Sequence, residues 1–171
     1  MAESEIVKSK EAFKKEARER AYNYERRYHG CSQCTLLALQ ELLGLEDELT
    51  FKAASSLCGG GALTGNTCGA LSGGVMVLSM KYGRANIEEG LAGLLKGMLP
   101  AYRLVKWFEG EFGTTVCHEI SGFEIDEDGL KGAIANPEAM EAGLDPELIE
   151  KCSQLVGKTA EKVAEIISEE G

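Results

Sequence analysis

Six cysteines carry the most specific chemistry in this sequence, and they come from five separate segments of the chain. A chain of 171 residues buries enough apolar surface to fold without disulfides, so the thiols need another explanation. Metal ligation and thiol–disulfide exchange both use the thiolate form of cysteine. The pattern therefore indicates a redox or metal site built from Cys31, Cys34, Cys58, Cys68, Cys117 and Cys152.

The motif Cys31-Ser-Gln-Cys34 places two thiols one helical turn apart, on one face of a helix. This spacing occurs both in dithiol redox motifs and in metal ligand pairs. Cys31 and Cys34 are therefore our candidate catalytic residues. We expect Cys31 to be the reactive sulfur because it lies nearest the helix start. Two buried cysteines that only fill the core are the structural alternative.

Several familiar metal sites do not match the spacing of the cysteines. A structural zinc site usually has two close ligand pairs, and this chain has one. The haem-attachment motif Cys-x-x-Cys-His is absent, as is a closely spaced ferredoxin run. His29 and His118 adjoin cysteine segments. Each could serve as a metal ligand or a proton carrier, or could be an ordinary surface residue. An iron–sulfur site here would have to be assembled from distant helices.

The elements that position the cysteines are predicted to be helices, because apolar residues recur at helical spacing and no strand-like alternation occurs. We expect an all-α, single-domain bundle over residues 1–171, built around a central buried helix at about 68–82. Residues 1–28 read as an exposed charged helix and residues 29–171 as the cysteine-bearing body. The other predicted pieces are helices over 31–45, 51–57 and 87–112 (kinked or divided at Pro100), a short helix that contains Cys117 and His118, and a last helix that begins at Asp145-Pro146. Residues 122–143 are acidic and are predicted to be irregular, with two short turns.

Cys31, Cys68 and Cys117 each fall near a predicted helix start. Backbone N–H groups and the helix dipole stabilise anions there, so we expect a lowered thiol pKa at these positions. Asn66 or Thr67 is the expected cap of the helix that contains Cys68. Thr114 and Thr115 are the expected caps before Cys117.

Glycine and other small residues are concentrated between Cys58 and residue 74. The run 59–61 reads either as a tight turn or as a source of backbone N–H groups for the sulfurs of a cluster. The small residues after Cys68 let another backbone or a bulky cofactor approach closely. The candidate cofactor-binding residues are Gly59, Gly60, Gly61, Gly69, Ala70 and Gly73.

The formal net charge is −10, and residues 119–171 carry fourteen Asp and Glu against four Lys. This balance argues against nucleic acid as a ligand. It fits either a solubilising surface or steering toward a basic partner.

No apolar stretch is long enough to insert into a membrane. We expect a cytoplasmic protein, because Gln40 and Glu41 interrupt the apolar stretch that a twin-arginine export signal would need. The expected partner is a redox protein, with a homodimer left open.

Short motifs along the chain resemble the C-GCAxxG-C-C family of redox-active proteins over about residues 22–170. They are Gly30-Cys31-Ser-Gln-Cys-Thr-Leu-Leu-Ala-Leu, the glycines 59–61, Thr67-Cys68-Gly-Ala-Leu-Ser-Gly73, Lys81-Tyr-Gly-Arg84, the run 111–117 and a cysteine in the last helix. The resemblance implies a bound prosthetic group. It assigns the four family cysteines to Cys31, Cys68, Cys117 and Cys152, which leaves Cys34 and Cys58 as additions.

Three functions follow from these observations. The first is electron transfer through an iron–sulfur cluster held by Cys31, Cys68, Cys117 and Cys152. The second is a cofactor-free thiol–disulfide oxidoreductase that uses Cys31 and Cys34, with Cys58 or Cys68 also able to resolve the disulfide. The third is a structural or binding module with buried cysteines.

Overall fold

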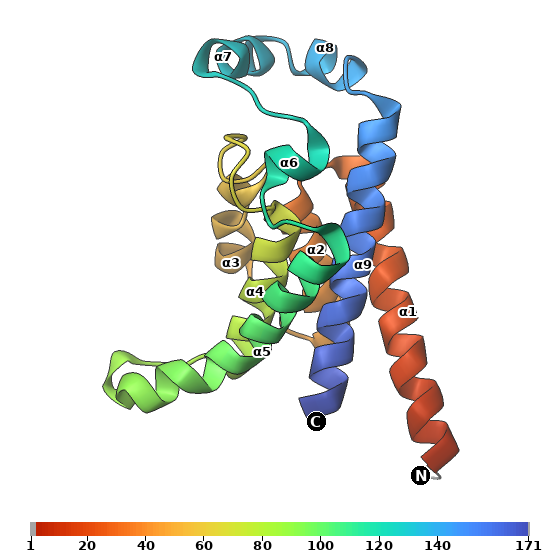
Figure 1. The fold of residues 1–171 in the computed structure, drawn as a ribbon, viewed down its shortest axis with the longest axis vertical. Helices are drawn as coiled ribbons and strands as arrows, with labels where there is room; N and C mark the ends of the chain where they lie inside the picture. Colours follow the sequence, from red (N-terminus) through yellow and green to blue (C-terminus); the bar gives the residue numbers. More distant parts are fainter. Residues whose placement is uncertain (1–2, 171) are drawn as a thin grey trace.

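The computed structural model describes residues 3–170, and every regular element in that range is helical (Figure 1). Its helices are α1 (Glu3–Tyr28), α2 (Cys31–Leu43), α3 (Glu48–Ala53), η1 (Ser55–Leu57), α4 (Gly69–Tyr82), η2 (Ile87–Glu89), α5 (Gly90–Phe112), α6 (Cys117–Ser121), α7 (Glu127–Ala135), α8 (Pro137–Ala142) and α9 (Pro146–Glu170). One isolated bridge joins Thr67 to Val116. The predicted all-α fold is confirmed.

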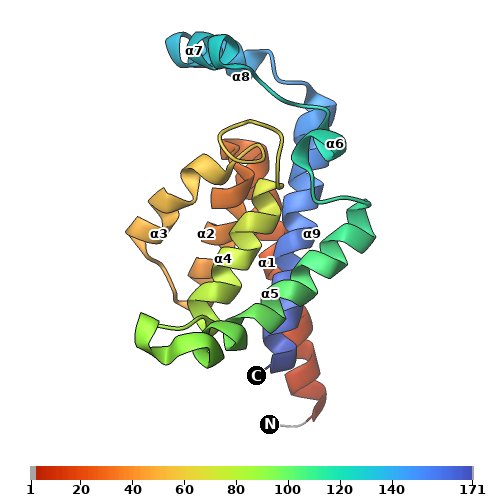
Figure 2. The ribbon, with the colours of Figure 1, turned by 60° about the vertical axis from the view of Figure 1, so that its left-hand side comes forward.

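The first and last helices, α1 and α9, lie antiparallel and side by side (Figures 1 and 2). Small residues allow this close approach, since a Cβ atom on Gly157 of α9 would stand 3.0 Å from the Arg18 carbonyl oxygen of α1. Ala17 and Ala21 on α1 are fully buried. The expectation of an exposed α1 is therefore correct only for its charged outer face, because its inner face belongs to the core.

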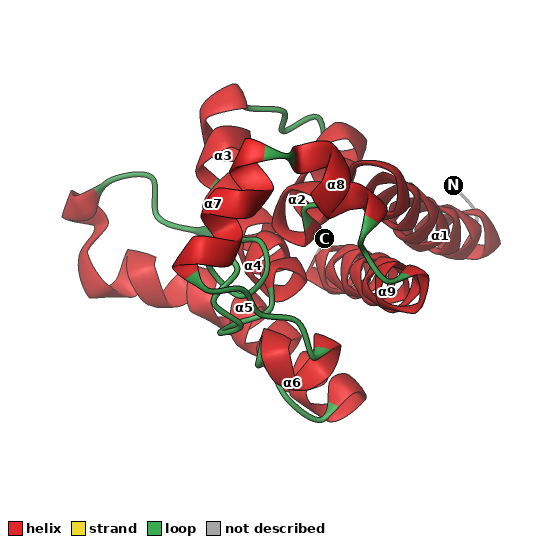
Figure 3. Ribbon diagram, turned by 90° about the horizontal axis from the view of Figure 1, so that it is seen from above, coloured by secondary structure: helices red, strands yellow, loops and turns green. Residues whose placement is uncertain are grey.

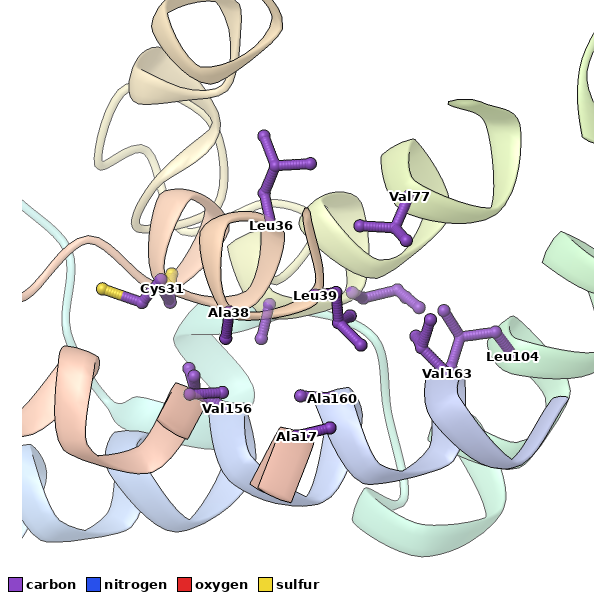
Figure 4. Close-up of a cluster of buried hydrophobic side chains, with 14 of the residues drawn as sticks. Ala17, Cys31, Leu36, Ala38, Leu39, Val77, Leu104, Val156, Ala160 and Val163 are labelled. Atoms are coloured by element: carbon purple, nitrogen blue, oxygen red, sulfur yellow. The ribbon is translucent and has the colours of Figure 1, made fainter. Parts of the chain in front are cut away.

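Helix α4 is the central helix, as predicted, and packs against α2, α5 and α9. Glycine is required along α4 because its neighbours come so close: a Cβ atom on Gly74 would lie 2.8 Å from the side chain of Leu104. Figure 4 shows the apolar side chains that meet between these helices, with Cys31 at one edge of the cluster. Cys31 thus lies at the edge of the apolar core.

Local signals set several helix ends where the sequence predicts them. Gly44 ends α2 in the left-handed conformation, with φ of 64°. The Asp145 carboxylate accepts a hydrogen bond from the Glu147 N–H at 3.0 Å and so begins α9.

The two caps expected beside cysteines are wrong. Cys68 itself is the cap residue of α4, and no side chain caps that helix end. The Thr114 hydroxyl accepts from the Val116 N–H, one residue before α6 begins, so it closes a turn rather than the helix. At the start of α6 the Cys117 and His118 N–H groups donate instead to the Asn66 and Gly65 carbonyl oxygens, at 2.6 Å and 2.9 Å.

Pro100 lies inside α5 without dividing it. Proline removes one backbone hydrogen bond, but the second half of α5 is anchored by buried Leu104 and Phe108, which hold the helix in place. The first half projects from the body (Figure 1) and, together with η2, leaves apolar side chains exposed. These exposed residues are Ile87, Leu91, Leu95, Met98, Leu99 and Tyr102.

Helices α7 and α8 replace the two short turns expected within residues 122–143. Each has a local cap: Asp126 accepts from the Gly129 N–H at 2.8 Å, and Asn136 accepts from the Ala139 N–H at 3.1 Å. The two helices extend over the end of the bundle where α2, α4, α6 and α9 begin (Figures 2 and 3). No helix among the described residues is long and apolar enough to cross a membrane.

Candidate functional site

Four cysteines from four elements line one cavity of about 200 Å³ at this end of the bundle: Cys31, Cys58, Cys117 and Cys152. The volume exceeds the ~150 Å³ of a protein cavity known to hold a benzene ring. Most of the remaining wall is apolar and includes Leu63, Phe123, Met140, Leu144, Leu148 and Ile149. Thiols that are distant in the sequence therefore face one compact, largely apolar space.

The cysteines on helices lie at or near helix starts, as predicted. Cys31 is the first residue of α2 and follows Gly30, whose φ of 95° suits glycine. Cys117 is the first residue of α6, and Cys152 lies in the second turn of α9. Free backbone N–H groups at helix starts stabilise negative charge nearby.

Cys31 and Cys58 are in direct contact. The Cys31 thiol donates to the Cys58 sulfur across 4.0 Å. Gly69, the first residue of α4, allows both residues to pack closely against that helix. A Cβ atom there would lie only 2.5 Å from the Cys31 sulfur and 3.2 Å from the Cys58 Cα. The glycine therefore serves the packing of this thiol pair.

The pKa values of these two thiols move in opposite directions. Donation to Cys58, and then burial, raise the pKa of Cys31 well above its ordinary value. The hydrogen bond from Cys31 lowers the pKa of Cys58. The expected lowering of the Cys31 pKa by its position at the helix start is therefore wrong. Burial and hydrogen bonding outweigh the helix dipole there, and Cys58 is the one cysteine of the six with a lowered pKa.

The other family cysteines are held as neutral thiols. Burial raises the pKa of Cys68 to about 12 and that of Cys152 to about 12. Burial also raises the pKa of Cys117, against a hydrogen bond with the Ser121 hydroxyl 3.8 Å away. Cys68 is 5% exposed and does not line the cavity, but it precedes Gly69, where a Cβ atom would lie 2.5 Å from the Cys31 sulfur. Metal binding would have to displace these protons.

Cys34 does not line the cavity, although it hydrogen-bonds to Glu25, which does. Its thiol donates to the His29 carbonyl oxygen at 3.2 Å and lines a separate pocket beside Tyr24, Tyr28 and Phe51. The thiol in contact with Cys31 is Cys58, so the structure does not bring the expected pair of Cys31 and Cys34 together. The reason is that the Cys34 side chain points back toward the loop between α1 and α2.

Glu25 is a residue of the cavity that the sequence analysis missed. Its side chain is 6% exposed and lines the cavity, and its Oε2 atom has no hydrogen-bond partner within the described residues. Burial raises the pKa of Glu25 to about 7, against a hydrogen bond from Cys34. The spacing of Ala17, Ala21 and Glu25 carries the missed signal, since it continues the buried face of α1.

The predicted cofactor-binding small residues have different surroundings. Gly59 lines the cavity, whereas Gly60 and Gly61 face a shallow pocket elsewhere on the loop. Ala70 is fully buried, and a Cβ atom on Gly73 would overlap the Ser32 carbonyl oxygen. Helix α2 thus fills the space beside Gly69, Ala70 and Gly73 that we expected a cofactor to use.

Of the two histidines, His29 lines the cavity, and His118 lies outside it, 3.5 Å from Glu124.

Across residues 3–170, no three His, Cys, Asp or Glu side chains are grouped closely enough to hold a single metal ion. An iron–sulfur cluster presents its iron atoms to several thiolates at once, so its ligands stand further apart than those of one ion.

Comparison with known proteins gives one match. The family described as "Putative redox-active protein (C_GCAxxG_C_C)" matches residues 29–166, which include the six cysteines and the cavity walls except Glu25. No curated protein matches the chain, and neither does any solved structure. Because the family match covers most of its length, this chain belongs to the C-GCAxxG-C-C family of redox-active proteins.

Proposed function

We propose that this protein transfers electrons through an iron–sulfur cluster held by Cys31, Cys68, Cys117 and Cys152. One observation carries the proposal: cysteines of α2, α6 and α9 open onto one cavity, and buried Cys68 adjoins Gly69, where a Cβ atom would lie 2.5 Å from the Cys31 sulfur. Four thiolates are the usual ligand set of such clusters.

The surroundings of the thiols suit this group. When bound, the cluster supplies one-electron redox chemistry at a potential set by its environment. The apolar residues of α8 and α9 limit the access of water. Backbone N–H groups at the starts of α2 and α4 offset part of the negative charge that four thiolates bring.

We also propose a basic redox protein as the electron partner. The carboxyl-terminal third of the chain is strongly acidic, with fourteen Asp and Glu against four Lys over residues 119–171. That segment includes α7 and α8, which lie over the cavity. Electron transfer to such a partner should slow as ionic strength rises, because salt screens the attraction between the two surfaces.

Anaerobic purification followed by a visible spectrum and by iron and sulfide assays tests the cluster. The wild-type protein should contain both elements, and Cys68→Ser should abolish them. Cys34→Ser is the matched control and should keep the wild-type content, because Cys34 lies in a separate pocket. Equal loss in both variants would make Cys34 a ligand. Iron-free wild-type protein, or full content in Cys68→Ser, would contradict the proposal.

A further inference from the structure

Cys58 is outside the proposed ligand set, yet its sulfur contacts that of a proposed ligand. Its distance from the Cys31 sulfur is 4.0 Å, and both residues line the cavity. The other neighbouring thiols have different partners: Cys117 contacts the Ser121 hydroxyl, and Cys34 donates to the His29 carbonyl oxygen. This contact assigns a specific chemical partner to Cys31 whenever its sulfur is not bound to iron.

We propose that Cys58 is a redox lock: in the cluster-free protein it forms a disulfide with Cys31 and thereby withdraws that sulfur from the ligand set. The effect of this disulfide on cluster loading rests on the proposed function, whereas the formation of the disulfide does not. The site would then accept a cluster only after the disulfide has been reduced.

The oxidant is a low-molecular-weight disulfide, RSSR, that reaches the cavity. The Cys58 thiol loses its proton and attacks one sulfur of RSSR, which releases the first RS⁻ and leaves a mixed disulfide on Cys58. The Cys31 thiol then loses its proton and attacks the Cys58 sulfur, which releases the second RS⁻. Each RS⁻ takes up one of the two protons. Two protein thiols are oxidised and RSSR is reduced to two RSH.

The order of attack follows from exposure. Cys58 is half-buried, whereas Cys31 is 9% exposed, so an external disulfide meets Cys58 first. The closing step then takes place between two sulfurs that are already neighbours.

The local backbone permits the closing step. The two sulfurs must approach from 4.0 Å to the bonded distance of about 2.05 Å. Cys58 has extended backbone angles, with φ of −63° and ψ of 148°, and follows η1 at the start of a loop rather than lying within a helix. No side chain stands between the pair and α4, because residue 69 is glycine. Rotation of the two side chains and a small loop movement can therefore close the gap.

Oxidised glutathione is the probe. The cluster-free, fully reduced protein is incubated with it anaerobically, the remaining thiols are alkylated in denaturant, and the peptides are mapped by mass spectrometry. We expect a linked peptide pair that contains Cys31 and Cys58. Cys34→Ser should form the same link. Cys58→Ser should form no link to Cys31, and Cys31→Ser should keep glutathione in a mixed disulfide on Cys58. A link from Cys31 to Cys34, or mixed disulfides alone in the wild type, would overturn the proposal.

A second measurement tests the consequence for cluster loading. Oxidised protein is freed of glutathione, and half of it is reduced with a phosphine that is then removed. Both halves receive ferrous iron and sulfide. We expect at least a tenfold lower iron content in the half that was not reduced, and equal content would overturn the lock. If neither half takes up iron while the Cys31–Cys58 link forms, the proposed function fails, and the thiol pair itself is left as the redox centre.

Discussion

Replacing Glu25 with glutamine should change how stability depends on pH, because this carboxyl group is buried in an apolar wall. Its pKa is raised from an ordinary value of 4.5 to about 7 by burial. Between these two pH values the folded chain keeps a proton that the unfolded chain has lost. The unfolding free energy of the wild type therefore falls as pH rises through this range.

The gap between 4.5 and about 7 corresponds to a total of about 3 kcal/mol, of which about 2.5 kcal/mol falls between pH 5 and pH 8. Glu25→Gln keeps the shape of the side chain but cannot ionise. The variant should therefore gain about 2.5 kcal/mol relative to the wild type when the pH is raised from 5 to 8. At pH 5 the two proteins should differ much less.

Urea denaturation of the cluster-free, reduced protein, followed by circular dichroism at pH 5 and pH 8, measures this difference. Comparison with the wild type cancels the titration of all shared groups. The control is Glu19→Gln on α1, where the carboxylate side chain is 58% exposed, and this variant should follow the wild type at both pH values. If Glu25→Gln shows the wild-type pH dependence, the carboxyl group is hydrated in solution and the reasoning fails.

Four further substitutions test the packing of the site and of the core, each by urea denaturation. Gly69→Ala should lose about 1–3 kcal/mol, because its Cβ atom would lie 2.5 Å from the Cys31 sulfur; Gly110→Ala, with nothing within 4 Å, should be neutral or gain up to ~1 kcal/mol. Equal effects of the two alanines would refute the close packing. Phe108→Ala should lose about 3–5 kcal/mol because the ring is fully buried, and a loss below 1 kcal/mol would contradict that burial. Ser32→Ala should lose about 1–3 kcal/mol because its buried hydroxyl donates to a carbonyl oxygen 2.8 Å away, and no loss would show that water replaces this donor.

Local signals made much of the fold predictable. Gly44 ends α2 and Pro146 begins α9 because each conformation is decided by the residue itself and its neighbours. The same kind of signal was available at Asp126 and Asn136, which cap α7 and α8, but the acidic sequence around them was interpreted as irregular. There, local capping was the stronger guide.

The candidate site was predictable only in part, because two of its features depend on tertiary packing. Helical spacing placed Cys31, Cys117 and Cys152 on inward or helix-start positions, and these residues do share the cavity. The contact between Cys31 and Cys58 depends on how the loop after η1 folds back onto α2, which no spacing rule gives. The thiol pKa values depend on burial, which opposes the helix dipole and is not visible in the position of a residue along a helix.

The first and last helices of the chain both line the cavity, and this has a consequence for biosynthesis. Glu25 leaves the ribosome early, whereas Cys152 on α9 follows Cys31 by 121 residues. At about 5–20 residues per second, that interval lasts roughly 6–24 s. During this time five of the six thiols have emerged without the wall that α9 provides. The proposed ligand set is therefore complete only once α9 has been synthesised, and the earlier thiols need protection from oxidants until then.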